Sequence, residues 1–449
     1  MRPVAHLSKS PMEDVLLGYE VNGATWFYLS LLLILAVFYR FNRFWSLRNF
    51  DLAILLSLSP GLLLIRAAAP ESPVGYLWLF AVTGVLWVRL LFDALFVRRP
   101  RLQQNLNPAG LAFLLCSALA FQTTKIVMEE PHEVTVNTVR QADDLLNRSD
   151  VEDLGPAAGP AGRLLATTVV PLSGGVEAAA ARCLAVLCHL AVMFGLVLIG
   201  RWHFSDTNIG LAMATLYLLL PCTSYDASRV THVLPGALIL WAVVAYRRPL
   251  WSGLLLGLAC GTMFFAVFLL PIWMSFYWKR GAWRFAAALG TVACVLLASL
   301  ALTSADSHSF TRQILGSIDW TALKFDAGYG VGLWSLYDPA YRIPVFTTFL
   351  VVLTTLTIWP LEKNLEHLLA HSASTVVATQ FWYPHEGGIY VLWYLPVVLV
   401  VAFRPRLAHL RPGDVEPAAT QTVPAPVLLS PSRSLVPDGP QRPNLWKTP

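Results

Sequence analysis

The sequence has few charged residues for its length. Only 13% of its 449 residues are Asp, Glu, Lys or Arg, whereas 56% are hydrophobic. In a soluble domain roughly a quarter of the residues are charged, because the surface of the domain must be hydrated. The composition therefore excludes an ordinary soluble protein and indicates a chain that crosses a membrane several times.

Cysteine and concentrated positive charge are also scarce. The six cysteines lie within or at the end of apolar runs: Cys116, Cys183, Cys188, Cys222, Cys260 and Cys294. In that setting they are small core residues, so we expect neither a disulfide framework nor a metal site. The net charge of +5 comes from short basic clusters between apolar runs, which excludes a nucleic-acid groove. We also expect no removable signal peptide, because no early apolar region precedes a small-residue cleavage site.

Long apolar runs are what the sequence has in abundance. Each is close to the roughly 20 residues with which a helix crosses a bilayer. They cover about 25–39, 51–66, 76–97, 109–127, 178–200, 208–221, 232–246, 285–303, 344–360 and 388–403. For two further segments, 251–278 and 365–381, the sequence leaves open whether they cross the membrane. We predict an all-α polytopic membrane protein with about 11 spans and one re-entrant helix pair.

The runs and the loops between them divide the chain into four regions. Residues 1–127 form an N-terminal block of four spans, and 128–177 form an acidic loop. Residues 178–411 form a transmembrane core that contains a second long polar loop at 304–343. Residues 412–449 are rich in proline and poor in aromatic residues, which predicts a disordered tail.

Basic residues orient the chain. They follow the first, third, fifth and seventh runs: Arg40, Arg43, Arg48, Arg98, Arg99, Arg101, Arg201, Arg247 and Arg248. The positive-inside rule places these turns in the cytoplasm. We therefore expect a multi-pass protein of the plasma (inner) membrane. Its N-terminus and acidic loop face outward, and its C-terminus faces the cytoplasm.

The two open segments are coupled, because Arg404, Arg406 and Arg411 should also lie inside. In one solution, 251–278 enters and leaves from the cytoplasmic side as two half-helices, and 365–381 crosses. In the other, 251–278 crosses as one tilted helix and 365–381 does not. Basic residues at both ends of 251–278 favour the hairpin. Three glycines spaced by four, at 253, 257 and 261, form a face on which another helix can pack closely.

The middle of the chain resembles a known family. The stretch "LLPCTSYDASRVTHVLPGALILWAVVAYRRPLWSGLLLGLACGTMFFAVFLLPIWMSFYWKRGAWRF" resembles the C-type glycosyltransferases, particularly their bacterial mannosyltransferase-like branch. The matching features are a basic turn at Arg247–Pro249, a "GLLLGLA" start, a "FLLP" about ten residues later and a second basic turn. The resemblance covers about residues 125–345. Two features depart from the family: "CGTMFFAVF" lacks the Lys of many relatives, and four spans precede the acidic loop where relatives usually have one.

The resemblance implies an activity and a place for its catalytic acid. Such enzymes take a sugar from a polyprenyl phosphate, a lipid-linked donor, and pass it to an extracytoplasmic glycan or lipid acceptor. In that family an Asp or Glu early in the first outer loop removes the acceptor's proton, which makes Glu133 and Glu130 the catalytic candidates here. The following "TVRQADDLLNRSDVEDLG" resembles the family's amphipathic helix. No cofactor other than the donor is implied.

Three polar residues open the seventh run. Asp226, Arg229 and His232 lie within seven residues, and Arg229 and His232 are three apart, so they share a helix face. We expect this group to bind a phosphate at a helix N-terminus. The alternative is an arginine anchored at the membrane interface beside its Asp partner.

Two other groups are candidate sites. His385 and Glu386 lie in "FWYPHEGGIYVLWYLP", beside two glycines, and could bind substrate as an acid/base pair. The aromatic residues of that stretch are typical of an interfacial belt. Arg89 and Asp93 are one turn apart within a span, and we expect them to pair with each other near the inner face.

The leading interpretation is a membrane hexosyltransferase with a C-type glycosyltransferase-like core. The first alternative is a transporter or flippase, since broken helices and intramembrane charges suit that class as well. The second is a catalytically inactive relative that acts as a membrane scaffold.

Overall fold

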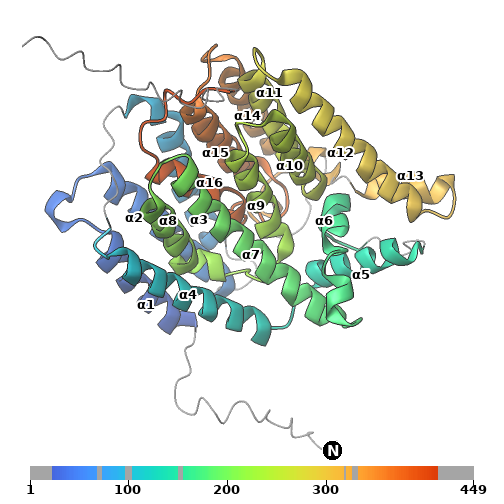
Figure 1. The fold of residues 1–449 in the computed structure, drawn as a ribbon, viewed down its shortest axis with the longest axis horizontal. Coiled ribbons are helices and arrows are strands. Elements are labelled where there is room, and N and C mark those ends of the chain that lie inside the picture. The colour runs from blue at the N-terminus through green and yellow to red at the C-terminus, as the bar shows by residue number, and fades with distance from the viewer. Residues whose placement is uncertain are drawn as a thin grey trace, which may run out of the picture. The chain divides into compact units, whose positions relative to one another are not determined.

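The computed structural model describes residues 23–67, 73–96, 104–149, 155–317, 320–325 and 332–412 (Figure 1). The chain divides into two units, Met1–Gly413 and Asp414–Pro449, and the description below concerns the first. Every regular element in the described ranges is helical, which confirms the all-α class. The tail after 412 lies outside the described residues, so its disorder stays a prediction.

The helices follow one another with short connections. They are α1 (Gly23–Phe38), α2 (Leu47–Ala67), α3 (Val74–Leu91), α4 (Pro108–Met128), α5 (Glu133–Asn147), α6 (Gly159–Ala166), α7 (Glu177–Trp202), α8 (Thr207–Leu219), α9 (Val230–Val244), α10 (Pro249–Thr262), α11 (Leu270–Tyr277), α12 (Ala282–Leu302), α13 (Ser307–Gly316), α14 (Arg342–Ile358), α15 (Leu365–Trp382) and α16 (Val391–Phe403). Short 3₁₀ turns join several of them, among them η3 (Asp93–Leu95), η5 (Pro221–Ser224) and η6 (Phe264–Leu269).

Within the described residues, six helices are long and apolar enough to cross a membrane. They cover Leu47–Arg66, Val74–Leu91, Pro108–Met128, Glu177–Trp202, Ala282–Leu302 and Pro339–Ile358. Other apolar helices, such as α8, α9 and α16, have only 13 to 15 residues. These helices indicate a membrane protein. The count of 11 spans stays a prediction, because the shorter helices do not reach the usual spanning length on their own.

α15 connects the two ends of the unit that matter for function. Its first turn carries Glu366, which pairs with Arg404 at the C-terminus of α16. Its last turn leads into the loop 383–390, where Glu386 pairs with Arg229 before α9. We call these the Arg89 end and the Arg229 end, after an arginine at each. α15 is almost wholly buried. It is not among the described helices that are long and apolar enough to cross a membrane, so the crossing of 365–381 stays a prediction.

The segment 249–281 folds back on itself. α10 stops because Met263 is extended, with φ −146° and ψ 134°, and α11 starts again with a proline in its first turn. The hydroxyl of Tyr277 donates to the carbonyl of Tyr246 at 2.6 Å. Gly281 lies so close to Pro249 that an added Cβ would be 2.6 Å from the proline ring. The two basic ends of the segment therefore meet, as the hairpin interpretation predicts, whereas their side of a membrane stays a prediction.

The glycines of α10 serve close packing, also as predicted. A Cβ added to Gly253 would lie 2.7 Å from the carbonyl oxygen of Phe285 on α12, and Gly257 faces Val292 one turn farther along. α10 and α12 accordingly run side by side in Figure 1. Because apolar side chains gain little from leaving lipid, such backbone approach and its van der Waals contacts hold helices together in a membrane.

Candidate functional site

A cavity of about 480 Å³ opens at the Arg229 end. We call it the Arg163 cavity. Its wall comes from α5 and α6, from the start of α9, from the break between α10 and η6, from the end of α13 and from the loop 383–390. Five segments far apart in the sequence thus meet around one space, an arrangement typical of a small-molecule site.

Hydrogen bonds hold α5 over this space. His132 is the N-cap of α5, and its Nδ1 accepts from the backbone of Val134 at 3.2 Å. The hydroxyl of Thr135 donates to the carbonyl of Ser228 at 2.7 Å and accepts from the backbone of Val230 at 3.0 Å, which ties α5 to the start of α9. A helix is therefore present over the first part of the predicted amphipathic segment 138–155, where it ends at Asn147, and it is docked on the core.

Arg163 is the least compensated charge in the wall. It is 5% exposed, and its guanidinium makes no hydrogen bond or ion pair with any described residue. Burial lowers the pKa of its guanidinium to about 10, while Asp144 raises it, so the group is still protonated at neutral pH. Because a buried charge without a partner is costly, an anion in the cavity would offset that cost.

Arg229 adds a second guanidinium to the same wall. Its Nη1 donates to Glu386 Oε2 at 3.0 Å, while its buried Nε has no partner among the described residues. Glu386 has the left-handed φ of 46°, which is uncommon for a residue with a side chain. Gly332 packs against it, and an added Cβ there would lie 3.1 Å from the Glu386 backbone.

Asp226 is the carboxylate best suited to accept a proton at this end. Its Oδ2 lies 3.6 Å from Nδ1 of His232, and its backbone carbonyl accepts from the Arg229 amide at 3.1 Å. Burial raises the pKa of the Asp226 carboxyl, and Arg229 opposes this shift. A raised pKa makes the carboxylate a stronger base. Nε2 of the buried His232 has no partner in the described part of the chain.

His132 is held neutral beside this group. Burial lowers the pKa of its imidazole, and the positive charge of Arg229 lowers it further. A neutral ring agrees with its Nδ1 acting as an acceptor in the N-cap. His132 therefore adds no charge that competes with Arg163 and Arg229 for an anion.

The structure brings most of the predicted binding residues together. Asp226, Arg229, His232 and Glu386 form one polar group, and His385 lines the cavity. The predicted catalytic residues Glu130 and Glu133 are exposed, and like Asp226, His232 and Glu386 they are not part of the cavity wall.

Two parts of the sequence interpretation need changes. The aromatic residues of 382–394 do not form an exposed belt. Trp382, Trp393 and Tyr394 are fully buried, and Tyr390 stacks on Trp393 with 4.0 Å between the rings. Arg163 was missed. The available signal was one arginine among apolar and small residues in "GPAGRLLA", inside an otherwise acidic loop.

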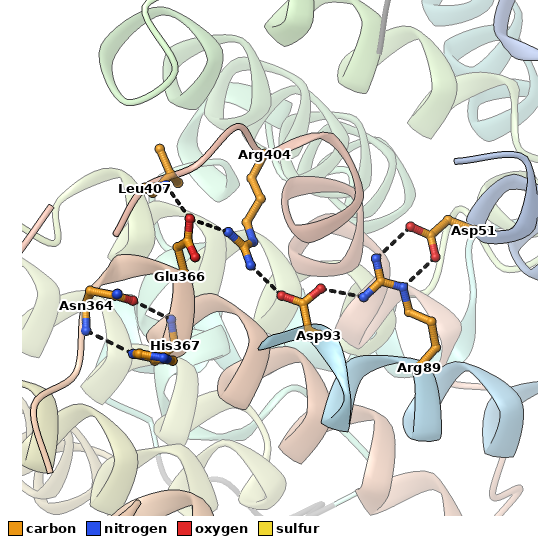
Figure 2. Close-up of polar contacts among 8 residues, drawn as sticks. All are labelled: Asp51, Arg89, Asp93, Asn364, Glu366, His367, Arg404 and Leu407. Atoms are coloured by element: carbon orange, nitrogen blue, oxygen red, sulfur yellow. Dashed lines mark hydrogen bonds and ion pairs between the residues drawn. The ribbon is translucent and has the colours of Figure 1, made fainter. Parts of the chain in front are cut away.

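The Arg89 end carries a different kind of charged group, an ionic chain of five residues (Figure 2). Arg89 contacts Asp51 at 2.6 Å and Asp93 at 2.5 Å. Arg404 contacts Asp93 at 2.5 Å and Glu366 at 2.7 Å. The predicted pairing of Arg89 with Asp93 is confirmed, and the chain extends it through α2, α15 and α16. Each of its charges faces an opposite charge, which suits a structural tie between the N-terminal block and the core.

Comparison with protein-family models finds no match, and comparisons with curated proteins and with solved structures find no similar protein.

Proposed function

We propose that this protein is a membrane glycosyltransferase that moves a hexose, mannose-like in class, from a polyprenyl phosphate to an extracytoplasmic acceptor. One observation carries the proposal. Two guanidinium groups line the Arg163 cavity. Arg163 is buried and makes no ion pair with a described residue, and Arg229 lies beside Asp226, a carboxylate of raised pKa just outside the cavity wall. Binding of a phosphate next to a base is what sugar transfer from a phosphate donor needs.

In this proposal Arg163 and Arg229 bind the donor phosphate. Guanidinium groups suit a phosphate because their planar donors match its oxygens. As the bond between the sugar and the phosphate oxygen breaks, that oxygen keeps the electron pair, and the two cations stabilise the added negative charge. When the phosphate binds, Arg229 either breaks its ion pair with Glu386 or contacts both groups at once.

Asp226 acts as the general base. The acceptor hydroxyl gives its proton to the Asp226 carboxylate while its oxygen attacks the anomeric carbon. His232 orients the carboxylate from 3.6 Å. Glu133 and Glu130 remain the positions that the family resemblance implies. None of the three carboxylates lines the cavity, but Asp226 is next to Arg229 in space and has a raised pKa, whereas Glu130 and Glu133 are exposed, so Asp226 is the stronger candidate.

The proposal also assigns an orientation. The Arg229 end faces outward, where the acidic loop lies, and the basic Arg89 end faces the cytoplasm. A transporter needs a path between both sides, whereas the residues that line the Arg163 cavity come from the Arg229 end. An inactive scaffold, in turn, has no use for a buried Arg163 that makes no ion pair in the described part of the chain.

A transfer assay tests the proposal. The purified protein is incubated in detergent with a polyprenyl phosphate that carries radiolabelled mannose, and with a mixture of glycan and lipid acceptors. Labelled product that forms with wild type and falls at least about tenfold with Asp226→Asn supports transfer. Uptake of label into sealed vesicles without any labelled product would support the transporter instead.

A further inference from the structure

A second cavity, of about 660 Å³, lies at the same end and was not anticipated. It opens between α1, α2 and α4 on one side and η5 on the other, where the N-terminal block meets the core. We call it the Arg66 cavity. None of its lining residues belongs to the wall of the Arg163 cavity, although both walls include part of the stretch 221–231.

The walls of the Arg66 cavity are apolar and aromatic. Trp26 and Phe121 stack with 3.7 Å between their rings, and Leu62, Leu63 and Met128 continue the surface. Leu63 and Met128 are 37% and 57% exposed, on helices that are apolar enough to cross a membrane. A membrane would place hydrocarbon chains directly against this opening, so the surroundings match a lipid tail.

Two cations lie at the polar end of the same cavity. Arg66 is exposed, and its side chain makes no hydrogen bond or ion pair with a described residue. Lys125 is 80% covered, donates to the carbonyl of Ser224 and lies 3.6 Å from Glu129. Glu129 balances one of the two charges, and the strongest attraction of the nearby Asp226 is to Arg229. One positive charge is therefore left, which a single phosphodiester would neutralise.

Unpaired polar atoms provide an independent sign of a ligand. Ser59 is 2% exposed, and its hydroxyl has no partner in the described part of the chain. The indole N–H of Trp26 is buried and lacks a partner as well. Both residues line the Arg66 cavity. Because buried donors are nearly always paired in native proteins, these two indicate a missing acceptor.

We propose that the Arg66 cavity binds an anionic membrane phospholipid, with its phosphate between Arg66 and Lys125, its ester oxygens accepting from Ser59 and Trp26, and its tails along Phe121 and Leu63. This site is separate from the sugar-transfer site and does not depend on that proposal. A lipid bound there would lie at the junction between α1, α2 and the core. This N-terminal block is the part in which the sequence departs from the family that it resembles.

Lipid retention tests this site. The full-length protein is stripped of lipid in detergent and then exposed to equal amounts of phosphatidylglycerol and phosphatidylcholine of the same chain length. We expect the purified wild type to retain phosphatidylglycerol about tenfold over phosphatidylcholine, because only the former has a net negative charge. Arg66→Glu should remove this preference, and Leu63→Trp should lower retention of both lipids by narrowing the tail path.

Controls separate the outcomes. Arg140→Glu reverses a charge on α5 that does not line the Arg66 cavity and should leave the preference unchanged. Arg66 is exposed and unpaired, so its substitution leaves folding intact, whereas Lys125→Ala also removes the bond to Ser224. Equal retention of the two lipids by wild type, or an unchanged preference in Arg66→Glu, would overturn the proposal. If excess inorganic phosphate displaced phosphatidylglycerol completely, the site would be one for free phosphate rather than for lipid.

Discussion

The two ends of the bundle differ in how their buried charges are paired. At the Arg89 end, five charged groups, four of them buried, form one chain in which neighbours lie 2.5–2.7 Å apart. At the Arg229 end, Arg163 is as deeply buried as Arg89, yet it has no partner among the described residues. Equal burial with unequal pairing indicates unequal roles, because only the unpaired charge has its interactions left for a ligand.

Removal of the proposed base should have the largest effect and should set the Arg229 end apart from the Arg89 end most clearly. Asp226→Asn keeps the size of the side chain but cannot accept a proton. We expect the transfer rate to fall by roughly a hundred- to ten-thousand-fold, with donor binding nearly unchanged. Glu133→Gln is the matched substitution at the position that the family resemblance implies. A larger loss for Glu133→Gln than for Asp226→Asn would return the role to Glu133.

The pH profile of the same reaction gives a second test of Asp226. The base works only when it is deprotonated, and burial raises its pKa. The rate should therefore decrease as the pH falls through that raised pKa, at a higher pH than the ordinary aspartate value of about 3.9 would give. An acidic limb that persists unchanged in the residual activity of Asp226→Asn would belong to another group.

Breaking the ionic chain should affect stability rather than chemistry. Arg89→Ala leaves Asp51 and Asp93 buried without their shared cation. Removal of one partner from a buried ion pair typically costs about 3–5 kcal/mol. We expect a marked decrease in the melting temperature of the purified protein. Wild-type stability of Arg89→Ala would mean that the chain is not a structural tie.

At the other end, loss of a cation should affect binding more than folding. Arg163→Ala removes a charge-assisted contact at a partly dry site, and Arg229→Ala should act in the same way. We expect each to weaken binding of a polyprenyl-phosphate donor by about 1.5–3 kcal/mol. Isothermal titration with each variant measures this. The melting temperature of Arg163→Ala should not fall, because that substitution breaks no bond with a described residue.

The smallest effect is expected at an exposed pair near the cavity. Arg140 and Glu177 lie 3.0 Å apart, with side chains 51% and 46% exposed. Water and salt screen such a pair, so Arg140→Ala should change stability by less than about 1 kcal/mol and should leave donor binding unchanged. An effect on donor binding equal to that of Arg163→Ala would show that general positive charge, rather than the cavity, attracts the donor.

The sequence predicted the parts of the fold that follow from local rules. Apolar runs predicted the helices, and basic residues at both ends of 251–278 predicted its return, because turns and charge placement are local properties. The amphipathic pattern likewise predicted α5. The number of membrane spans was harder to predict from the sequence, since α8 and α16 have only 13 residues each and are buried by their neighbours.

The site was predictable only where its residues are close in sequence. Asp226, Arg229 and His232 lie within one helical start, so their grouping was visible. The contact of Arg229 with Glu386 joins residues 157 positions apart, and the burial of Arg163 depends on how α6 docks on the α10 break. Such placement is set by tertiary packing, which no local pattern encodes.

Binding of a matched pair of lipids tests the central claim, that the Arg163 cavity holds a phosphate, most directly. Polyprenyl phosphate and the polyprenol of the same length differ only in the phosphate, and their affinities for the purified protein can be compared in detergent. We predict that wild type binds the phosphate at least about tenfold more tightly, and that Arg163→Ala combined with Arg229→Ala abolishes this difference. Equal affinities for the two lipids in wild type, or a preference that survives in the double variant, would contradict the account.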